Sequence, residues 1–127
     1  MKRKTVVLLF CLALILPVAT TVFAADQVTL RVATVKTDNA DAYVKELAKG
    51  QALMKKLGSS AIIRVWRARF AGDNAGSIVV SVEYPSLMAM AKDEAMVEAN
   101  AEYQTWFKGL DKLRTIVSDS IYNELKP

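Results

Sequence analysis

Four segments of the chain alternate apolar and polar residues with the period of two that is typical of β-strands. In the first of them, Q-V-T-L-R-V-A-T-V-K, Val28 and Leu30 fall on one face and Arg31 on the other. The second, I-I-R-V-W-R-A-R-F, mixes three arginines with a tryptophan, and a turn with Gly72 and Gly76 follows it. The expected strands span residues 27–36, 60–70, 77–84 and 114–122.

Two longer segments place apolar residues three or four positions apart, which is the spacing of one face of an α-helix. The first begins at Asp38, with Asp41 in its first turn, and ends before Gly58. The second begins after Ser86, a residue suited to cap a helix, and Asn100 interrupts it and caps a further segment. An aromatic stripe at helical spacing follows, formed by Tyr103, Trp106 and Phe107.

The predicted elements follow the order β-α-β-β-α-β. Because β-α-β crossovers are almost always right-handed, both helical regions lie on the same face of one sheet. The sequence therefore predicts an α+β, ferredoxin-like sandwich with the sheet order 4-1-3-2. The strands at residues 60–70 and 114–122 form its two edges, and no helix covers the other face of the sheet.

An uncovered sheet face with two free edges favours association, because apolar side chains and unpaired backbone groups are exposed there. A two-fold dimer that packs the two uncovered faces together removes this exposure. If the second strand of one chain meets the fourth strand of the other, the eight strands close into a barrel. The expected partner is therefore a second copy of the same chain.

The N-terminal segment has the layout of a secretory signal peptide. Three cationic residues precede an apolar run from Val6 to Leu16, Pro17 breaks the run, and Val22-Phe23-Ala24 forms a cleavage site. The run makes about 17 Å of helix, which is too short for a hydrocarbon core of about 30 Å. We expect cleavage after Ala24, which leaves a single domain at residues 25–127 that is periplasmic or secreted and has no membrane contact.

Removal of residues 1–24 changes the charge and the available chemistry. The segment holds three of the 17 Lys and Arg and none of the 13 Asp and Glu, so the mature chain has a net charge of +1. Such a chain has no long-range attraction for nucleic acid. Cys11 is the one cysteine and His is absent, which excludes thiolate and His-based catalysis and the usual zinc sites. No metal or cofactor is expected.

Three segments resemble the dimeric α/β-barrel superfamily, which includes antibiotic-biosynthesis-monooxygenase-like, NIPSNAP-like and stress-responsive proteins. They are R-V-W-R-A-R-F, E-Y-P-S-L and E-Y-Q-T-W-F-K-G-L-D-K-L, and the similarity covers residues 27–125. The resemblance implies the same fold and a homodimer. Its members include cofactor-free monooxygenases, isomerases and haem-degrading enzymes that commonly use a histidine, which this chain lacks. In some relatives a cavity lies between sheet and helices, which would place it beside Tyr43 and Trp106.

Strand alternation places a set of polar and aromatic side chains on the uncovered face, inside the expected barrel. In a ligand pocket, Arg31 and Arg64 would hold an anionic or quinone-like oxygen, and Trp66 would stack on a flat ligand. Glu83 or Tyr122 would move a proton. As a dimer interface, the same residues would pair charges and pack. The candidates are Arg31, Arg64, Trp66, Glu83 and Tyr122.

The sequence therefore predicts an exported homodimeric α/β-barrel protein that binds a small ligand, such as an aromatic molecule, or serves a stress-related role. The alternative is a cofactor-independent monooxygenase or isomerase that acts on a small aromatic, quinol or ketone substrate. An open cavity in which Arg64, Trp66 and a carboxylate converge would favour the enzyme, whereas a filled barrel would contradict it.

Overall fold

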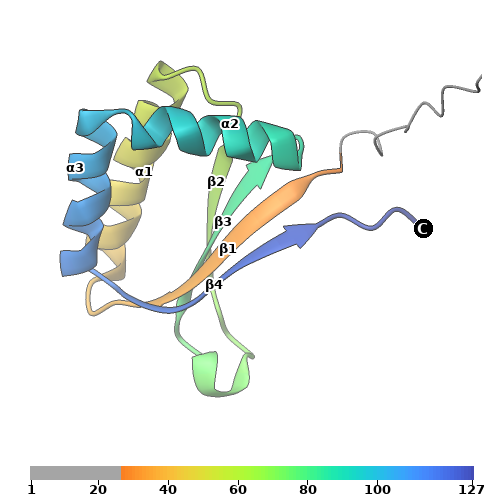
Figure 1. Ribbon diagram of the computed structural model, residues 1–127. Helices are drawn as coiled ribbons and strands as arrows, with labels where there is room; N and C mark the ends of the chain where they lie inside the picture. Colours follow the sequence, from red (N-terminus) through yellow and green to blue (C-terminus); the bar gives the residue numbers. More distant parts are fainter. Residues whose placement is uncertain (1–26) are drawn as a thin grey trace, which may run out of the picture.

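The computed structural model describes residues 27–127, and the predicted signal peptide at residues 1–24 lies outside the described residues. The chain forms one four-stranded antiparallel sheet with its helices on one side (Figure 1). The predicted β-α-β-β-α-β order is confirmed, with the second helical region in two parts. The elements are β1 (Thr29–Lys36), α1 (Ala40–Lys56), β2 (Ile62–Arg67), η1 (Gly72–Asn74), β3 (Ile78–Tyr84), α2 (Leu87–Glu98), α3 (Ala101–Gly109), η2 (Leu110–Lys112) and β4 (Thr115–Asn123).

The strands lie in the order β2-β3-β1-β4, which confirms the predicted order 4-1-3-2 and makes β2 and β4 the edges. The ladder between β1 and β4 contains a bulge, because Thr34 pairs with Ser118 and Val35 pairs with Ile116. Val117 is the extra residue, so Ile116 and Ser118 lie on opposite faces of the sheet although they are two positions apart.

Helix boundaries follow from local capping. Asn39, not Asp38, caps α1, because its side-chain oxygen accepts a hydrogen bond of 3.0 Å from the amide of Ala42. Ser86 caps α2 as predicted. The predicted interruption at Asn100 is confirmed as well, since its side chain accepts a 2.8 Å hydrogen bond from the amide of Tyr103 and so starts α3.

Strand β2 is shorter than predicted, by two residues at its start and three at its end. It ends at Arg67, and Ala68 still donates a backbone hydrogen bond of 2.9 Å to Ser77. The following turn uses Gly72 and Gly76 in the positive-φ region, at 53° and 84°, as the sequence indicated. Phe70 therefore lies outside the ladder and is fully exposed.

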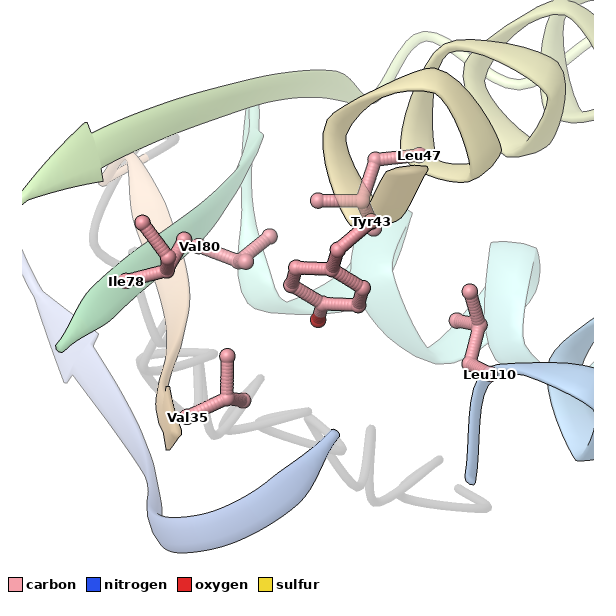
Figure 2. Close-up of a cluster of buried hydrophobic side chains, with 6 residues drawn as sticks. All are labelled: Val35, Tyr43, Leu47, Ile78, Val80 and Leu110. Carbon is pink, nitrogen blue, oxygen red and sulfur yellow. The ribbon is translucent and has the colours of Figure 1, made fainter. Parts of the chain in front are cut away.

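The core lies between the sheet and α1 (Figure 2). Its main cluster joins the sheet residues Val35, Ile78 and Val80 to Tyr43 and Leu47 of α1 and to Leu110, as Figure 2 shows. A second cluster beneath α2 contains Met54, Ala61, Tyr84, Met90 and Val97. Both clusters lie on the helix side, so the opposite face of the sheet remains uncovered by the described residues.

Helices α1 and α3 meet closely at Gly50. A Cβ atom at that position would lie 2.0 Å from the indole of Trp106, so the contact requires glycine. The indole Nε1 of Trp106 also donates a hydrogen bond of 2.9 Å to the backbone oxygen of Glu46. Trp106 is thereby fixed against α1, with its ring toward the sheet.

Candidate functional site

Four of the five predicted site residues lie on the uncovered face. Arg64 and Trp66 of β2 face the same side as Glu83, because Arg64 pairs with Ser81 and Trp66 with Val79 in the ladder. Tyr122 lies opposite Leu30 and lines an open depression beside Glu83. The structure thus brings these residues to one surface, as the alternation predicted.

The contacts on that face are weak. The Nε atom of Arg64 lies 3.8 Å from the carboxylate of Glu83, and both side chains are partly exposed. Trp66 donates a hydrogen bond of 3.0 Å from Nε1 to the hydroxyl of Ser81, yet 55 % of the residue is exposed in the single chain. Exposed ion pairs of this kind contribute little to stability. In the single chain these residues form a flat polar and aromatic surface rather than a closed pocket.

The prediction that Arg31 lies on the uncovered face is wrong. Arg31 points to the helix side, where Nε and Nη2 donate to the two carboxylate oxygens of Asp119 at 3.1 and 2.8 Å. Nη1 donates to Glu94 of α2 at 3.1 Å. The alternation misled the assignment because β1 carries apolar residues on both faces, and Val35, on the side of Arg31, is the one that is fully buried.

This pairing shifts the charge states of both partners. The hydrogen bonds that Arg31 donates to Asp119 raise the pKa of Arg31, although partial burial opposes this. Conversely, the hydrogen bond from Arg31 lowers the pKa of Asp119. The carboxylate is therefore ionised at neutral pH and already occupied by a cation, which makes it a poor general base.

A cavity of about 90 Å³ lies between the sheet and the helices α1 and α3. Aliphatic side chains line most of it. Its aromatic and cationic residues are Arg31, Tyr84, Tyr103, Trp106, Phe107 and Arg114. Trp106 thus lies where the family resemblance placed it, whereas Tyr43 belongs to the fully buried core.

The aromatic wall of the cavity comes from α3. Tyr103 and Phe107 stack with ring centroids 6.1 Å apart, and Tyr103 meets Trp106 at 5.1 Å. The i, i+3, i+4 spacing of these residues aligns them along one helix face. Phe107 is 36 % exposed and stands at the rim, so it is the wall residue that can move most freely.

Two tyrosines of the cavity lining, Tyr84 and Tyr103, have hydroxyls that can donate hydrogen bonds. Burial raises the pKa of Tyr84 to about 12, and burial also raises the pKa of Tyr103. Both hydroxyls therefore remain protonated at neutral pH. Together with Arg31 they provide hydrogen-bond donors and positive charge, and neither tyrosine acts as a base at that pH.

Arg114 is the second cation of the cavity, and its side chain is only 6 % exposed. Its Nη1 donates a hydrogen bond of 3.0 Å to the hydroxyl of Tyr43, and its guanidinium lies 5.2 Å from the ring centre of Phe107. The guanidinium is held in place mainly by aromatic partners. Its nearest carboxylate, that of Asp111, is 3.9 Å from Nε and largely exposed.

Sequence reasoning missed Asp119, Arg114 and the two tyrosines as site residues. One signal for the first was present. Arg31 is the single charge within residues 28–35, and Asp119 is the single charge within β4. Because the predicted sheet order already made these strands neighbours, opposite charges in them were candidates for a cross-strand pair.

No family model matches the sequence, and a search of curated proteins finds no match. Solved structures do match. The cofactor-independent oxygenase SnoaB from Streptomyces nogalater is similar with a TM-score of 0.60 and 17 % identity, over 81 % of this chain and 97 % of its own. A NIPSNAP family protein from Agrobacterium tumefaciens has a TM-score of 0.60 at 17 % identity, over 80 % and 85 %.

A third similar structure is a putative antibiotic biosynthesis monooxygenase from Nitrosomonas europaea, with a TM-score of 0.51 and 19 % identity over 80 % of this chain and 91 % of that one. The protein is thus an α+β protein of the ferredoxin-like class. Its fold is similar to the folds of these oxygenase, NIPSNAP and antibiotic-biosynthesis-monooxygenase structures, as the resemblance implied.

None of the helices in residues 27–127 is both long and apolar enough to cross a membrane. Among the same residues, no three His, Cys, Asp or Glu side chains are grouped so that they could hold a metal ion.

Proposed function

We propose that this protein binds a small planar ligand in the cavity between its sheet and its helices. The observation that carries the proposal is the combination of an aromatic wall, formed by Tyr103, Trp106 and Phe107, with two arginines in the same cavity. A flat ring stacks on such a wall, and an electron-rich oxygen on the ring accepts hydrogen bonds from Arg31 or Arg114. Phenols, quinols and quinones have both features.

The volume of the cavity sets a condition on binding. Ligand pockets usually measure about 300–1000 Å³, and an engineered cavity of about 150 Å³ holds benzene. At about 90 Å³ this cavity admits a single ring only if its rim opens. Phe107 and Ile116 line the rim and are 36 % and 47 % exposed, so their side chains can rotate outward without leaving a buried void.

Binding is favoured over catalysis by the state of the carboxylate. Deprotonation of a substrate requires a base with a pKa near the working pH. Asp119 is paired with Arg31 and its pKa is lowered, and the tyrosines of the cavity have raised pKa values. The alternative, a cofactor-independent monooxygenase or isomerase, is supported by the fold of SnoaB and by the arginines, which would stabilise an aromatic anion. It requires a substrate acidic enough to lose its proton without a strong base.

Ligand binding is testable by fluorescence. In a Trp66→Phe background Trp106 is the only tryptophan of the mature chain, so its emission reports on the cavity. We expect hydroquinone and 1-naphthol to change this emission with saturation. Phe107→Ala opens the rim and should tighten 1-naphthol binding by about tenfold, since the second ring then enters the enlarged cavity without displacing the Phe107 side chain.

Met88→Ala serves as the matched control for that titration, because Met88 is an exposed apolar residue of α2 outside the cavity lining. A linear response, or equal affinities for Phe107→Ala and Met88→Ala, would contradict a ligand site here. An oxygen electrode in the same cell distinguishes the two functions. Consumption of O₂ that depends on the protein and on hydroquinone would support the monooxygenase, and its absence with saturable binding would support a binding protein.

We further propose that the chain acts outside the cytoplasm as a homodimer, in the periplasm or as a secreted protein. The apolar N-terminal run and the Val22-Phe23-Ala24 site support export. Exposed Ile62 and Trp66 on edge strand β2, with exposed Tyr122 on edge strand β4, lie on the uncovered face and support pairing of the two edges in a barrel. A small-ligand or stress-related role fits such an assembly.

Export predicts a defined N-terminus. When the full chain is expressed in a bacterium with an intact secretion pathway, the intact mass of the exported protein should correspond to a start at Ala25 or Asp26. Replacement of Ala24 by Phe should block processing, because a signal peptidase requires a small residue there. An exported protein that retains residues 1–24 would refute the assignment.

A further inference from the structure

A second hollow, separate from the cavity beneath the helices, lies at the end of the sheet where β1 ends and where β3 and β4 begin. Its volume is about 530 Å³, within the range of about 300–1000 Å³ that is typical of ligand sites. Three connecting segments form it, at residues 36–39, 75–77 and 111–115. We call it the end cleft.

Two buried polar side-chain atoms in residues 27–127 have no hydrogen-bond partner, and both belong to residues that line the end cleft. They are Nε of Arg114 and the hydroxyl of Ser77. The side chain of Arg114 is 6 % exposed and Ser77 is 4 % exposed. An unsatisfied buried donor is costly, and the cost is larger for a charged group. Both residues line the same hollow, so a ligand bound there that reached these two atoms would remove both costs.

The chemistry of these atoms defines that partner. An arginine Nε–H donates and never accepts, and a serine hydroxyl donates readily. The partner must therefore offer acceptor oxygens. Because the guanidinium is a buried positive charge, an anionic oxygen is bound more strongly than a neutral one. A carboxylate or phosphate group meets both requirements.

The sheet register brings further positive charge to the same place. Lys36 pairs with Thr115 on β4, and since Val35 pairs with Ile78, Lys36 lies next to Ser77, which directly precedes β3. Lys112 lines the cleft as well. The charged residues of the lining are three cations and two acids, namely Lys36, Lys112, Arg114, Asp38 and Asp111. The lining has a net charge of +1 from these five residues, which favours an anion.

Asp111 is the internal competitor for Arg114. Its carboxylate oxygen is 3.9 Å from Nε, beyond hydrogen-bond distance, and its side chain is 69 % exposed. It therefore lowers the attraction for a second anion but leaves the donor unoccupied. Water is the other competitor, and a neutral water compensates the buried guanidinium less well than an anion does.

We propose that the end cleft binds the carboxylate or phosphate group of a small molecule, with Arg114 Nε and the Ser77 hydroxyl as donors and with Lys36 and Lys112 supplying charge. This proposal does not rest on the proposed aromatic ligand. Arg114 lines both hollows, whereas Ser77 lines only the end cleft, so Ser77 separates the two sites experimentally.

The test is an NMR titration of the chain from Ala25 to Pro127 with sodium phosphate and, separately, with sodium acetate, at constant ionic strength set by chloride. The side-chain Nε–H resonance of Arg114 is the readout. We expect it to shift with saturation, with a Kd in the millimolar range or tighter, together with the amides of residues 36–39 and 111–115. Tighter binding of phosphate would assign a phosphate ligand, and tighter binding of acetate a carboxylate.

Variants assign the contacts. Ser77→Ala should weaken the binding about tenfold, as expected when a hydrogen bond to a charged group is lost. Asp111→Asn should strengthen it, because the competing carboxylate is neutralised. Arg114→Lys keeps the charge but lacks Nε, and it should weaken binding even where its fold is intact by the amide spectrum. Ser118→Ala, in an exposed position of β4, is the matched control and should leave the affinity unchanged.

A shift that stays linear in both salts would overturn the proposal and would assign the two donors to water. Equal affinities for Ser77→Ala and Ser118→Ala would overturn it as well, because the anion would then bind elsewhere. Neither result would contradict the proposed binding of an aromatic ligand, because that binding is measured separately by Trp106 fluorescence.

Discussion

Gly50→Ala is expected to lower the free energy of unfolding by about 2–3 kcal/mol, although alanine is the better helix former by about 1 kcal/mol. The new Cβ atom would lie 2.0 Å from the indole of Trp106, which is rigid and held by its hydrogen bond to Glu46. The indole must move away, and the packing of α3 on α1 weakens with it. Urea unfolding followed by circular dichroism, at one chain concentration, measures the loss.

Gly109→Ala is the matched control for this prediction. Gly109 ends α3, and nothing lies within 4 Å of a Cβ atom placed there. We expect its stability to be unchanged or up to about 1 kcal/mol higher. If Gly50→Ala were as stable as Gly109→Ala, the close approach of α1 and α3 described above would be incorrect.

Trp66→Ala is expected to weaken the proposed dimer by about 2 kcal/mol or more, which is about a thirtyfold rise in the dimer Kd. Trp66 lies on edge strand β2 and is 55 % exposed in the single chain. In the barrel this side chain would be buried against the partner, and buried tryptophans are frequent hot spots of interfaces. Sedimentation equilibrium over a range of chain concentrations measures the Kd.

Leu87→Ala is the control for the dimer. Leu87 has a similar exposure of 52 % but belongs to α2, on the helix side of the sheet, so its removal should leave the Kd unchanged. A wild-type chain that is monomeric at micromolar concentration would contradict the barrel. If Trp66→Ala instead kept the dimer intact and abolished ligand binding, Trp66 would be a ligand-stacking residue in an open barrel.

The fold was largely predictable because each element leaves a local signature. Alternation located the four strands, Ser86 and Asn100 marked helix starts through their capping side chains, and two glycines marked the turn before β3. The sheet order then followed from the handedness of the crossovers. The errors in the predicted elements were confined to the ends of strands and helices. Strand β2 stops at Arg67 because the glycine-rich turn bends the chain away, and Asn39 replaces Asp38 as the cap.

The candidate site was predictable only in part, because it depends on which face of a strand is covered. Arg64, Trp66 and Glu83 lie together on the uncovered face as expected. Arg31 does not, since β1 has apolar residues on both sides and its alternation is ambiguous. The choice is made by the fully buried Val35 and by the carboxylates of Asp119 and Glu94, which lie on the helix side.

The sequence by itself determined the element order, the topology of the sheet and the absence of histidine from the whole chain, because these depend on local periodicity, chain handedness and composition. Only the tertiary structure decided which polar groups are paired and which are not. Arg31 is satisfied by residues 63 and 88 positions away, while Arg114 Nε and the Ser77 hydroxyl have no hydrogen-bond partner within residues 27–127. Such pairing depends on burial and on distances between segments that are remote along the chain, and no local pattern records it.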